Sequence, residues 1–358
     1  MELFVASDDE PEHDGPYLPS SQVPHSQPPS ASQEARFVAA TTTTRHLADV
    51  FGSITPVSKE AVITIGSDGM RIYAESEHRS SNLSVTIDST VFRQWQITPP
   101  NATLKLQLDI SLIASALSSV PNDPEGKHTC IFSYDGLGSP FVIEFEDNLI
   151  SERIEMHTYV HDIDDGPHVL GIDRSRVHFE ITLDSKTFTA LLESLHNVGT
   201  TEVSLNISNT PETDIRHQLT GGNHNSLFFV SKGPIGLMKV IYPGMPTVLE
   251  RVDIYDDSDN PTPITSQVSS SYSFKQLGQI LKAVRLSSKC KLVKDYRGVL
   301  SLQLLCRNQS NATLMTYNLV ELSNVEIVYD EEPMAVEPQS DQEYEIERGP
   351  AFDTPIFL

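Results

Sequence analysis

Hydrophobic and polar positions follow one recurring order from Phe37 onward. A short stretch that alternates with a period of two is followed by a polar residue suited to capping a helix, and then by an apolar stripe with helical spacing. This order occurs four times, and further alternating stretches follow each stripe. The pattern predicts antiparallel sheets with helices on one face. This is an α+β fold, and it differs from the regular alternation of a parallel sheet.

Three of the four expected helices have boundary signals in the sequence. The first ends before Pro56, the second lies between the N-cap Asp109 and Pro121, and the third lies between the N-cap Asp184 and Gly199. The inward stripes are Leu47, Val50, Phe51 and Ile54; Leu112, Ile113, Ala116, Leu117 and Val120; Phe188, Leu191, Leu192, Leu195 and Val198; and Phe274, Leu277, Ile280, Leu281 and Val284.

The four copies fall into two pairs. A polar link at 161–176, with a Gly-Pro pair and four Asp, separates a first domain at 36–160 from a similar second domain at 177–330. Residues 1–35 and 331–358 are rich in acidic and polar residues and are expected to be disordered tails. The third copy carries a long polar insertion between two expected strands.

The stretch "SYDGLGSPFVIEFED" contains a Gly-x-Gly that suggests a phosphate-binding loop. Such a loop has to open a helix, because the helix N-terminus supplies the N–H groups for phosphate. The residues after Pro140 instead alternate as a second strand. A hairpin turn is therefore predicted at 135–140.

Charge is distributed unevenly along the chain. The two tails carry −7 and −8 of the formal −24, which leaves −9 for residues 36–329. Residues 264–297 nevertheless have a local net charge of +6, with Asp295 as the one acid. The seven bases there are Lys275, Lys282, Arg285, Lys289, Lys291, Lys294 and Arg297.

The fourth helix, expected over 274–289, concentrates this positive charge. At 100° per residue, the side chains of Lys275, Lys282, Arg285 and Lys289 share one sector, apart from the apolar stripe. They could form a solvated surface, or a field that attracts a polyanion. The other helices add only Arg45 and Lys186, and no base-reading motif is present, so any nucleic-acid contact would be with backbone phosphates.

Catalytic and metal-binding patterns are weak. Acidic clusters at 162–165, 256–259 and 144–147 could suit a two-metal nuclease, but each is better explained as a solvated loop or strand face. No cofactor or metal is predicted. The three cysteines form no C-x-x-C pair, and no secretory leader or apolar run of membrane length is present, so a cytosolic or nuclear location is expected.

Several stretches resemble a known family. "YDGLGSPFVIEFEDNLISERIEMHTYV", "LADVFGSI", "LKLQLDISLIASAL", "IGLMKVIYPG" and the closing "DTPIFL" are similar to Rad-one-type subunits of the DNA-damage checkpoint clamp. That clamp is the heterotrimeric nine-one-one ring related to PCNA. The resemblance covers roughly residues 36–330 and the last few residues.

The resemblance implies a two-domain sliding-clamp fold, with sheets outside and helices lining a central hole. Two other clamp subunits would complete a nuclear ring around double-stranded DNA. A dedicated clamp loader would place it at damage sites, where it would recruit checkpoint kinase activators and repair factors. A 3′–5′ DNA exonuclease and a protein-only scaffold without DNA contact are the alternatives.

The resemblance also assigns residues. Lys275, Lys282, Arg285 and Lys289 would face the hole, with Lys186 and Arg45 as weaker candidates. Strands at 150–160 and 235–242 would pair with neighbouring subunits through Ile154, Met156, Tyr159, Leu237, Lys239 and Ile241. Ser21, Ser26 and Ser32 each precede Gln and are candidate phosphorylation sites, and the final Ile356, Phe357 and Leu358 are a candidate docking peptide.

Overall fold

The computed structural model describes residues 35–120, 128–146, 151–160, 170–208, 226–242, 248–255, 267–308 and 311–322. The described residues up to Glu321 belong to one compact unit. The Ser-Gln pairs, the C-terminal docking residues, most of the link and the polar insertion lie outside the described residues, so the expectations for them stay predictions.

A ten-stranded antiparallel sheet runs through both predicted domains, in the order β10-β6-β2-β3-β4-β19-β18-β17-β11-β15. Strand β19 pairs with β4, so the last described strand joins the two parts of the chain into one sheet. The bounds are β2 Glu60–Gly66, β3 Gly69–Glu75, β4 Ser81–Asp88, β6 Leu104–Asp109, β10 Tyr159–Val160, β11 Val177–Asp184, β15 Leu249–Ile254, β17 Ser287–Asp295, β18 Val299–Asn308 and β19 Asn311–Val320.

Two smaller antiparallel sheets accompany it. One has the order β5-β1-β7-β8-β9 and the other β14-β13-β12-β16. Their strands are β1 Arg36–Thr41, β5 Gln94–Thr98, β7 Thr129–Tyr134, β8 Phe141–Glu146 and β9 Ser151–Met156, and β12 Glu202–Ser208, β13 Ser226–Gly233, β14 Gly236–Tyr242 and β16 Gln267–Ser273. Strands β9 and β14 are each the last strand of their sheet, so each leaves one edge unpaired within the described chain.

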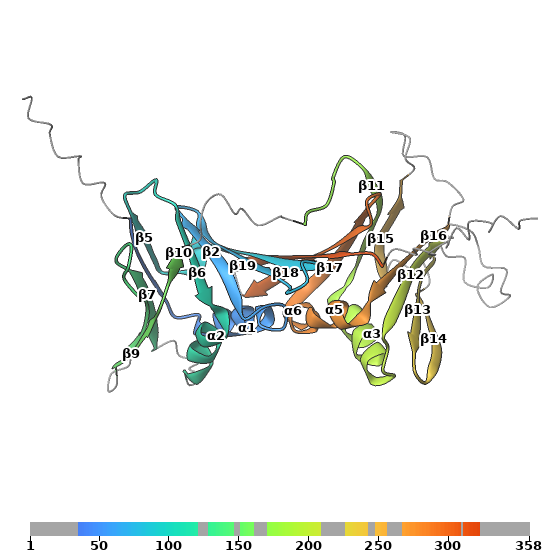
Figure 1. Ribbon diagram of the computed structural model, residues 1–358, viewed down its shortest axis with the longest axis horizontal. Helices are drawn as coiled ribbons and strands as arrows, with labels where there is room; N and C mark the ends of the chain where they lie inside the picture. The colour runs from blue at the N-terminus through green and yellow to red at the C-terminus, as the bar shows by residue number, and fades with distance from the viewer. Residues whose placement is uncertain are drawn as a thin grey trace, which may run out of the picture. The chain divides into compact units, whose positions relative to one another are not determined.

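The helices pack on one face of the ten-stranded sheet, against the core residues of its central strands (Figure 1). They are α1 Thr44–Ile54, α2 Ile110–Ser119, α3 Ser185–Asn197, α5 Phe274–Gln279 and α6 Leu281–Leu286, with a short 3-10 turn, η1, at Ser89–Val91. The carboxylates of Asp109 and Asp184 accept hydrogen bonds from N–H groups at the starts of α2 and α3, which confirms both predicted N-caps.

The Gly-x-Gly stretch forms the predicted hairpin. Strands β7 and β8 are antiparallel and Tyr134 pairs with Phe141, so the chain reverses direction over 135–140. Gly136 and Gly138 have φ values of 123° and 82°, a backbone region that side chains disfavour. The two glycines therefore serve the turn between strands.

Two local predictions were wrong. Leu112 was expected in the core, but its side chain is 53% exposed. Helix α2 begins at Ile110, and its buried stripe takes Ile113, Ala114 and Leu117, the positions three, four and seven residues later. Leu112 lies 200° around the helix from Ile110, away from that stripe.

The single strand expected at 150–160 is two strands. Strand β9 ends at Met156 and pairs with β8, while β10 pairs with β6 of the ten-stranded sheet. His157 and Thr158 lie between them, and the Thr158 hydroxyl donates to the Ser139 carbonyl oxygen at 3.2 Å. The alternation ends at Met156 because the chain changes sheets there.

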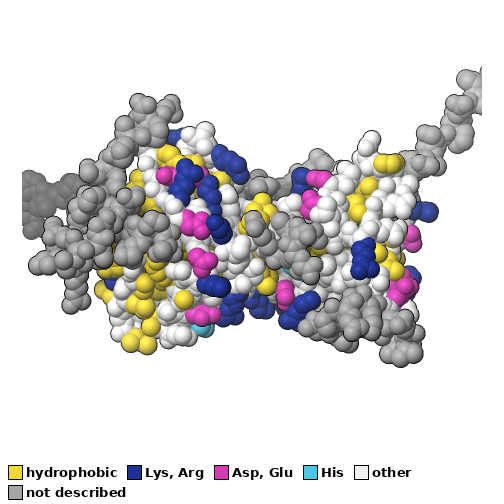
Figure 2. Space-filling view, turned by 180° about the vertical axis from the view of Figure 1, so that it is seen from behind, with side chains coloured by type: hydrophobic (Ala, Val, Ile, Leu, Met, Phe, Trp, Pro, Cys, Tyr) yellow, Lys and Arg dark blue, Asp and Glu magenta, His cyan; other side chains and the backbone are white. Residues whose placement is uncertain are grey.

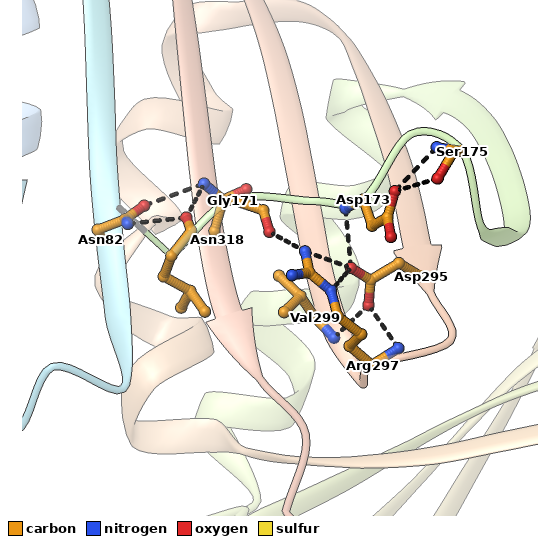
Figure 3. Close-up of polar contacts among 9 residues, drawn as sticks. Asn82, Gly171, Asp173, Ser175, Asp295, Arg297, Val299 and Asn318 are labelled. Atoms are coloured by element: carbon orange, nitrogen blue, oxygen red, sulfur yellow. Dashed lines mark hydrogen bonds and ion pairs between the residues drawn. The ribbon is translucent and has the colours of Figure 1, made fainter. Parts of the chain in front are cut away.

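The end of the link is fixed to the large sheet by buried polar groups (Figure 3). The amides of Asn82 and Asn318 both donate to the Leu170 carbonyl oxygen at 2.9 Å. The carboxylate of Asp295, which is fully buried, accepts from the N–H groups of Asp173 and Val299 at 2.9 Å. Arg297 donates to the same carboxylate at 3.2 Å and to the Gly171 carbonyl oxygen at 2.8 Å. These bonds hold residues 170–173 across strands β4, β19 and β17.

We expect Asp295→Ala to lower the free energy of unfolding by about 3 kcal/mol, because several buried donors lose their acceptor at once. Urea unfolding followed by circular dichroism measures this loss. Glu202→Ala, which breaks an exposed ion pair with Lys232, is the control and should cost less than about 1 kcal/mol. Equal losses in the two variants would contradict the anchoring role of Asp295.

Candidate nucleic-acid interface

The five helices of the described residues carry more basic than acidic side chains. Their exposed bases, named here the helix-face cations, are Arg45, Lys186, Lys275, Lys282 and Arg285. Their acids are Asp49 on α1 and Glu193 on α3, and α2 has no charged residue. Figure 2 shows Lys and Arg side chains along the lower middle of the view, the level at which the helices lie in Figure 1. In a chain of net charge −24, this surface suits an anion.

The fourth predicted helix is interrupted at Ile280. The Ile280 N–H group donates to the carbonyl oxygens of Leu277 and Gly278, three and two residues earlier. An α-helical hydrogen bond would reach four residues back, so the chain is wound more tightly here. The Gln276 carbonyl oxygen, freed by this change, accepts from the buried Tyr317 hydroxyl at 2.9 Å. Gly278 also lowers helix propensity at this place. The break therefore has both a local and a tertiary cause.

The expected place of Lys289 on this helix was wrong. Helix α6 ends at Leu286, and the backbone is extended from Ser287 as strand β17 begins. Cys290 and Leu292 on β17 are buried in the core beneath the helices. Because side chains alternate along a strand, Lys289 lies on the opposite face of the sheet. Its ammonium group pairs there with the Glu250 carboxylate at 2.8 Å.

The local charge of +6 at 264–297 therefore does not form one surface. Lys291 pairs with Glu180 at 2.9 Å, and Arg297 pairs with the buried Asp295. Lys294 is only 6% exposed, and its ammonium group lies 2.7 Å from the Glu321 carboxylate. From the start of strand β17 onward, each of these bases has an acidic partner: Arg297 pairs with Asp295 in the same segment, and the lysines pair with acids from other parts of the chain.

The helix-face cations are of two kinds. Arg45 pairs with Asp49 at 3.4 Å, and Arg285 pairs with Glu193 at 2.7 Å. Within the part of the chain that the structure describes, Lys186, Lys275 and Lys282 have no acidic partner and are exposed. Sequence spacing could have revealed the Arg45 pair, four residues apart. It could not reveal the Arg285 pair, whose members are 92 residues apart.

The predicted edge residues lie on three strands at the ends of sheets, β9, β10 and β14, and they differ in exposure. On β14, the side chains of Leu237 and Lys239 are exposed, with Leu237 at 75%, and Ile241 is partly buried. The residues predicted for the other edge are more scattered: Ile154 on β9 is partly buried, Met156 is 4% exposed in the core, and Tyr159 is exposed but belongs to β10.

Other polar groups on the predicted edge are already engaged. Arg153 on β9 lies 2.6 Å from the Glu144 carboxylate and 2.8 Å from that of Glu155, so Glu144 belongs to a surface ion-pair network.

No three His, Cys, Asp or Glu side chains within the described ranges converge as metal ligands would. No helix in the same ranges has the length and apolar character to span a bilayer.

Similarity to solved structures defines the class of fold. PCNA from Entamoeba histolytica has a TM-score of 0.61 and 12% identity, covering 80% of this chain and 99% of that one. The PCNA2-PCNA3 complex from Sulfolobus tokodaii has a TM-score of 0.59 and 12% identity, with coverages of 79% and 98%. The chain thus has the α+β fold of PCNA-type sliding clamps, as predicted.

Sequence comparison identifies the family. The family model described as repair protein Rad1/Rec1/Rad17 matches residues 36–306. The DNA damage checkpoint control protein RAD17 of Saccharomyces cerevisiae is 27% identical over 287 residues, which cover 78% of this chain and 67% of that protein. The corresponding protein rad1 of Schizosaccharomyces pombe is 25% identical over 288 residues, covering 75% and 81%. The chain belongs to the Rad1/Rec1/Rad17 family, which confirms the resemblance found in its sequence.

His46 on α1 provides a pH-dependent contact beneath the cationic surface. Its Nε2 atom lies 2.9 Å from the Thr313 hydroxyl oxygen on β19. Burial lowers the pKa of His46 below 6.5, and the nearby Asp49 carboxylate opposes this shift. The folded chain therefore disfavours the protonated imidazole.

We expect this histidine to make folding less favourable in acid. As pH falls through 6.5, the unfolded chain protonates His46 more readily than the folded chain does. The free energy of unfolding therefore decreases as pH falls, until pH reaches the lower pKa of His46 in the folded chain. His46→Gln should reduce the pH dependence of the free energy of unfolding, measured by urea titration from about pH 8 to about pH 5. An unchanged slope would show that His46 does not contribute.

Proposed function

We propose that this chain is one subunit of a heterotrimeric ring that encircles double-stranded DNA in the nucleus. A clamp loader places the ring on DNA at sites of damage, and the loaded ring recruits checkpoint kinase activators and repair factors. Membership of the Rad1/Rec1/Rad17 family and the PCNA fold support this function. So do the names of the relatives, which are DNA damage checkpoint control proteins.

The observation that carries the proposal is the sign of charge on the helices. The chain has 49 acidic and 25 basic residues, yet the helices that the structure describes carry five exposed bases and two acids. Basic side chains on a shared surface attract backbone phosphates whatever the base sequence. Lys186, Lys275 and Lys282 are the strongest candidates, because all three are exposed and none is paired with an acid in the described chain.

Two of the unpaired strand edges, on β9 and β14, support the assembly. Exposed edge strands such as β9 and β14 are sites where another chain adds a strand. Leu237 on β14 exposes an apolar side chain that a neighbouring subunit would cover. We assign β14 to one neighbour, through Leu237, Lys239 and Ile241, and β9 to the other, with Ile154 and the nearby Tyr159. Met156 supports that edge from the core.

We expect the double variant Lys275→Glu/Lys282→Glu to load poorly onto nicked circular DNA while its ring still assembles. Loss of two phosphate contacts should reduce the slope of log K against log salt by about 2. The measurement is the amount of the purified complex retained on the circle, followed by its release after the circle is cut.

Lys289→Glu is the matched control, because Lys289 is exposed but lies on the sheet face opposite the helices. It should load like the wild type. Equal loading by the double variant and the wild type would favour a scaffold without DNA contact. If the wild-type complex dissociated from intact circles as fast as from cut circles, encirclement would be contradicted.

A second variant tests assembly. Leu237→Asp should weaken the complex at least about 30-fold, because a carboxylate would be buried at the subunit contact. Analytical ultracentrifugation of the co-expressed subunits measures this effect. Leu314→Asp, at a 47% exposed position on β19, is the control and should assemble normally. An unchanged complex with Leu237→Asp would rule out β14 as a subunit edge.

A further inference from the structure

One acid, Glu193, lies among the helix-face cations of α3, α5 and α6. Glu193 is two helical turns after Lys186, so the two side chains share one face of α3. Across from it on α6, Arg285 is three residues after Lys282, and these two side chains are neighbours. Glu193 therefore lies between bases on two different helices.

The contact between Glu193 and Arg285 is specific. Arg285 donates to a single Glu193 carboxylate oxygen, Oε1, from Nη2 at 2.7 Å and from Nε at 3.2 Å. Both side chains stay accessible, at 52% for Arg285 and 44% for Glu193. The pair links α3 to α6, yet solvent or a ligand can reach both members.

We propose that Glu193 is an internal counter-ion of Arg285, which competes with DNA phosphate and limits how tightly the helices hold the duplex. This inference rests on the proposed function. Glu193 would set the strength of the contact between Arg285 and a DNA phosphate. Lys275 and Lys282 would attract phosphates without a competing carboxylate.

Elementary electrostatics gives the direction of the effect. A phosphate that binds Lys282 replaces only mobile ions, so binding releases counter-ions and depends strongly on salt. A phosphate that binds Arg285 must first displace the Glu193 carboxylate, which then remains nearby as a like charge. Glu193 thus cancels much of what Arg285 could contribute. A weaker hold suits a ring that moves along DNA without dissociating.

Glu193→Gln tests the inference, because it removes the charge and keeps the size of the side chain. The complex purified through a tag on this chain is titrated with a short blunt duplex at several salt concentrations. We expect binding about two- to fivefold tighter at low salt. We also expect a slope of log K against log salt that is steeper by up to about 0.9, because Arg285 becomes a full phosphate ligand.

Glu250→Gln is a closely matched control. Glu250 pairs with Lys289 at 2.8 Å, with exposures of 41% and 57%, so the pair resembles Glu193–Arg285 in distance and accessibility. It lies on the opposite face of the sheet, and the substitution removes the same charge. It should leave the salt slope unchanged. A gain of equal size in both variants would reduce the effect to net charge and overturn the inference.

The double variant Glu193→Gln/Arg285→Gln separates the pair from the rest of the helix surface. The gain should disappear, because Arg285 is the group that Glu193 restrains; a gain that persists would overturn the inference. Binding by Glu193→Gln that equals the wild type would also overturn it. If Lys275→Glu/Lys282→Glu has no effect on DNA binding either, the proposed function fails with it. If that variant weakens binding, only the role of Glu193 fails.

Discussion

The pairing of β4 with β19 is the interaction on which the arrangement of this chain depends. Seven residues of each strand pair in antiparallel register, from Thr313 with Ile87 to Leu319 with Ser81. Without this pairing, the strands of the two predicted domains would belong to separate sheets. Because β19 is the last described strand, the continuous sheet requires contacts between residues more than 200 apart in sequence, as in the pair of Thr313 and Ile87.

Strand β19 also shapes the cationic surface from below. Met315, Tyr317 and Leu319 are fully buried on the side of the helices. The Tyr317 hydroxyl bonds to the Gln276 carbonyl oxygen at the break between α5 and α6, and burial raises the pKa of this phenol to about 12, so it stays a donor. Strand β19, which joins the two parts of the sheet, therefore also stabilises the break between α5 and α6. This break gives Lys275 and Lys282 a different relative direction from the one they would have on a continuous helix.

The sequence predicted features with local causes. Strand alternation, the N-caps Asp109 and Asp184, and the hairpin at 135–140 each depend on residues close together along the chain, and all are confirmed. The break at Ile280, the start of β17 before Lys289 and the Glu193–Arg285 pair depend on distant partners. Helical periodicity across 274–289 was present in the sequence, but pairing of β17 with β11 and β18 is what determines the conformation of its last residues.

These tertiary partners change what the charge pattern means. Counted along the sequence, residues 264–297 form one cationic segment. In the folded chain, Lys289 and Lys291 meet acids on the face opposite the helices, and Lys294 is paired inside the protein. Because a paired base contributes little field at a distance, the effective charge of this segment is concentrated on α5 and α6. If the chain holds DNA as proposed, the acidic remainder would repel the duplex from other surfaces, and the unpaired lysines would direct it to the helices.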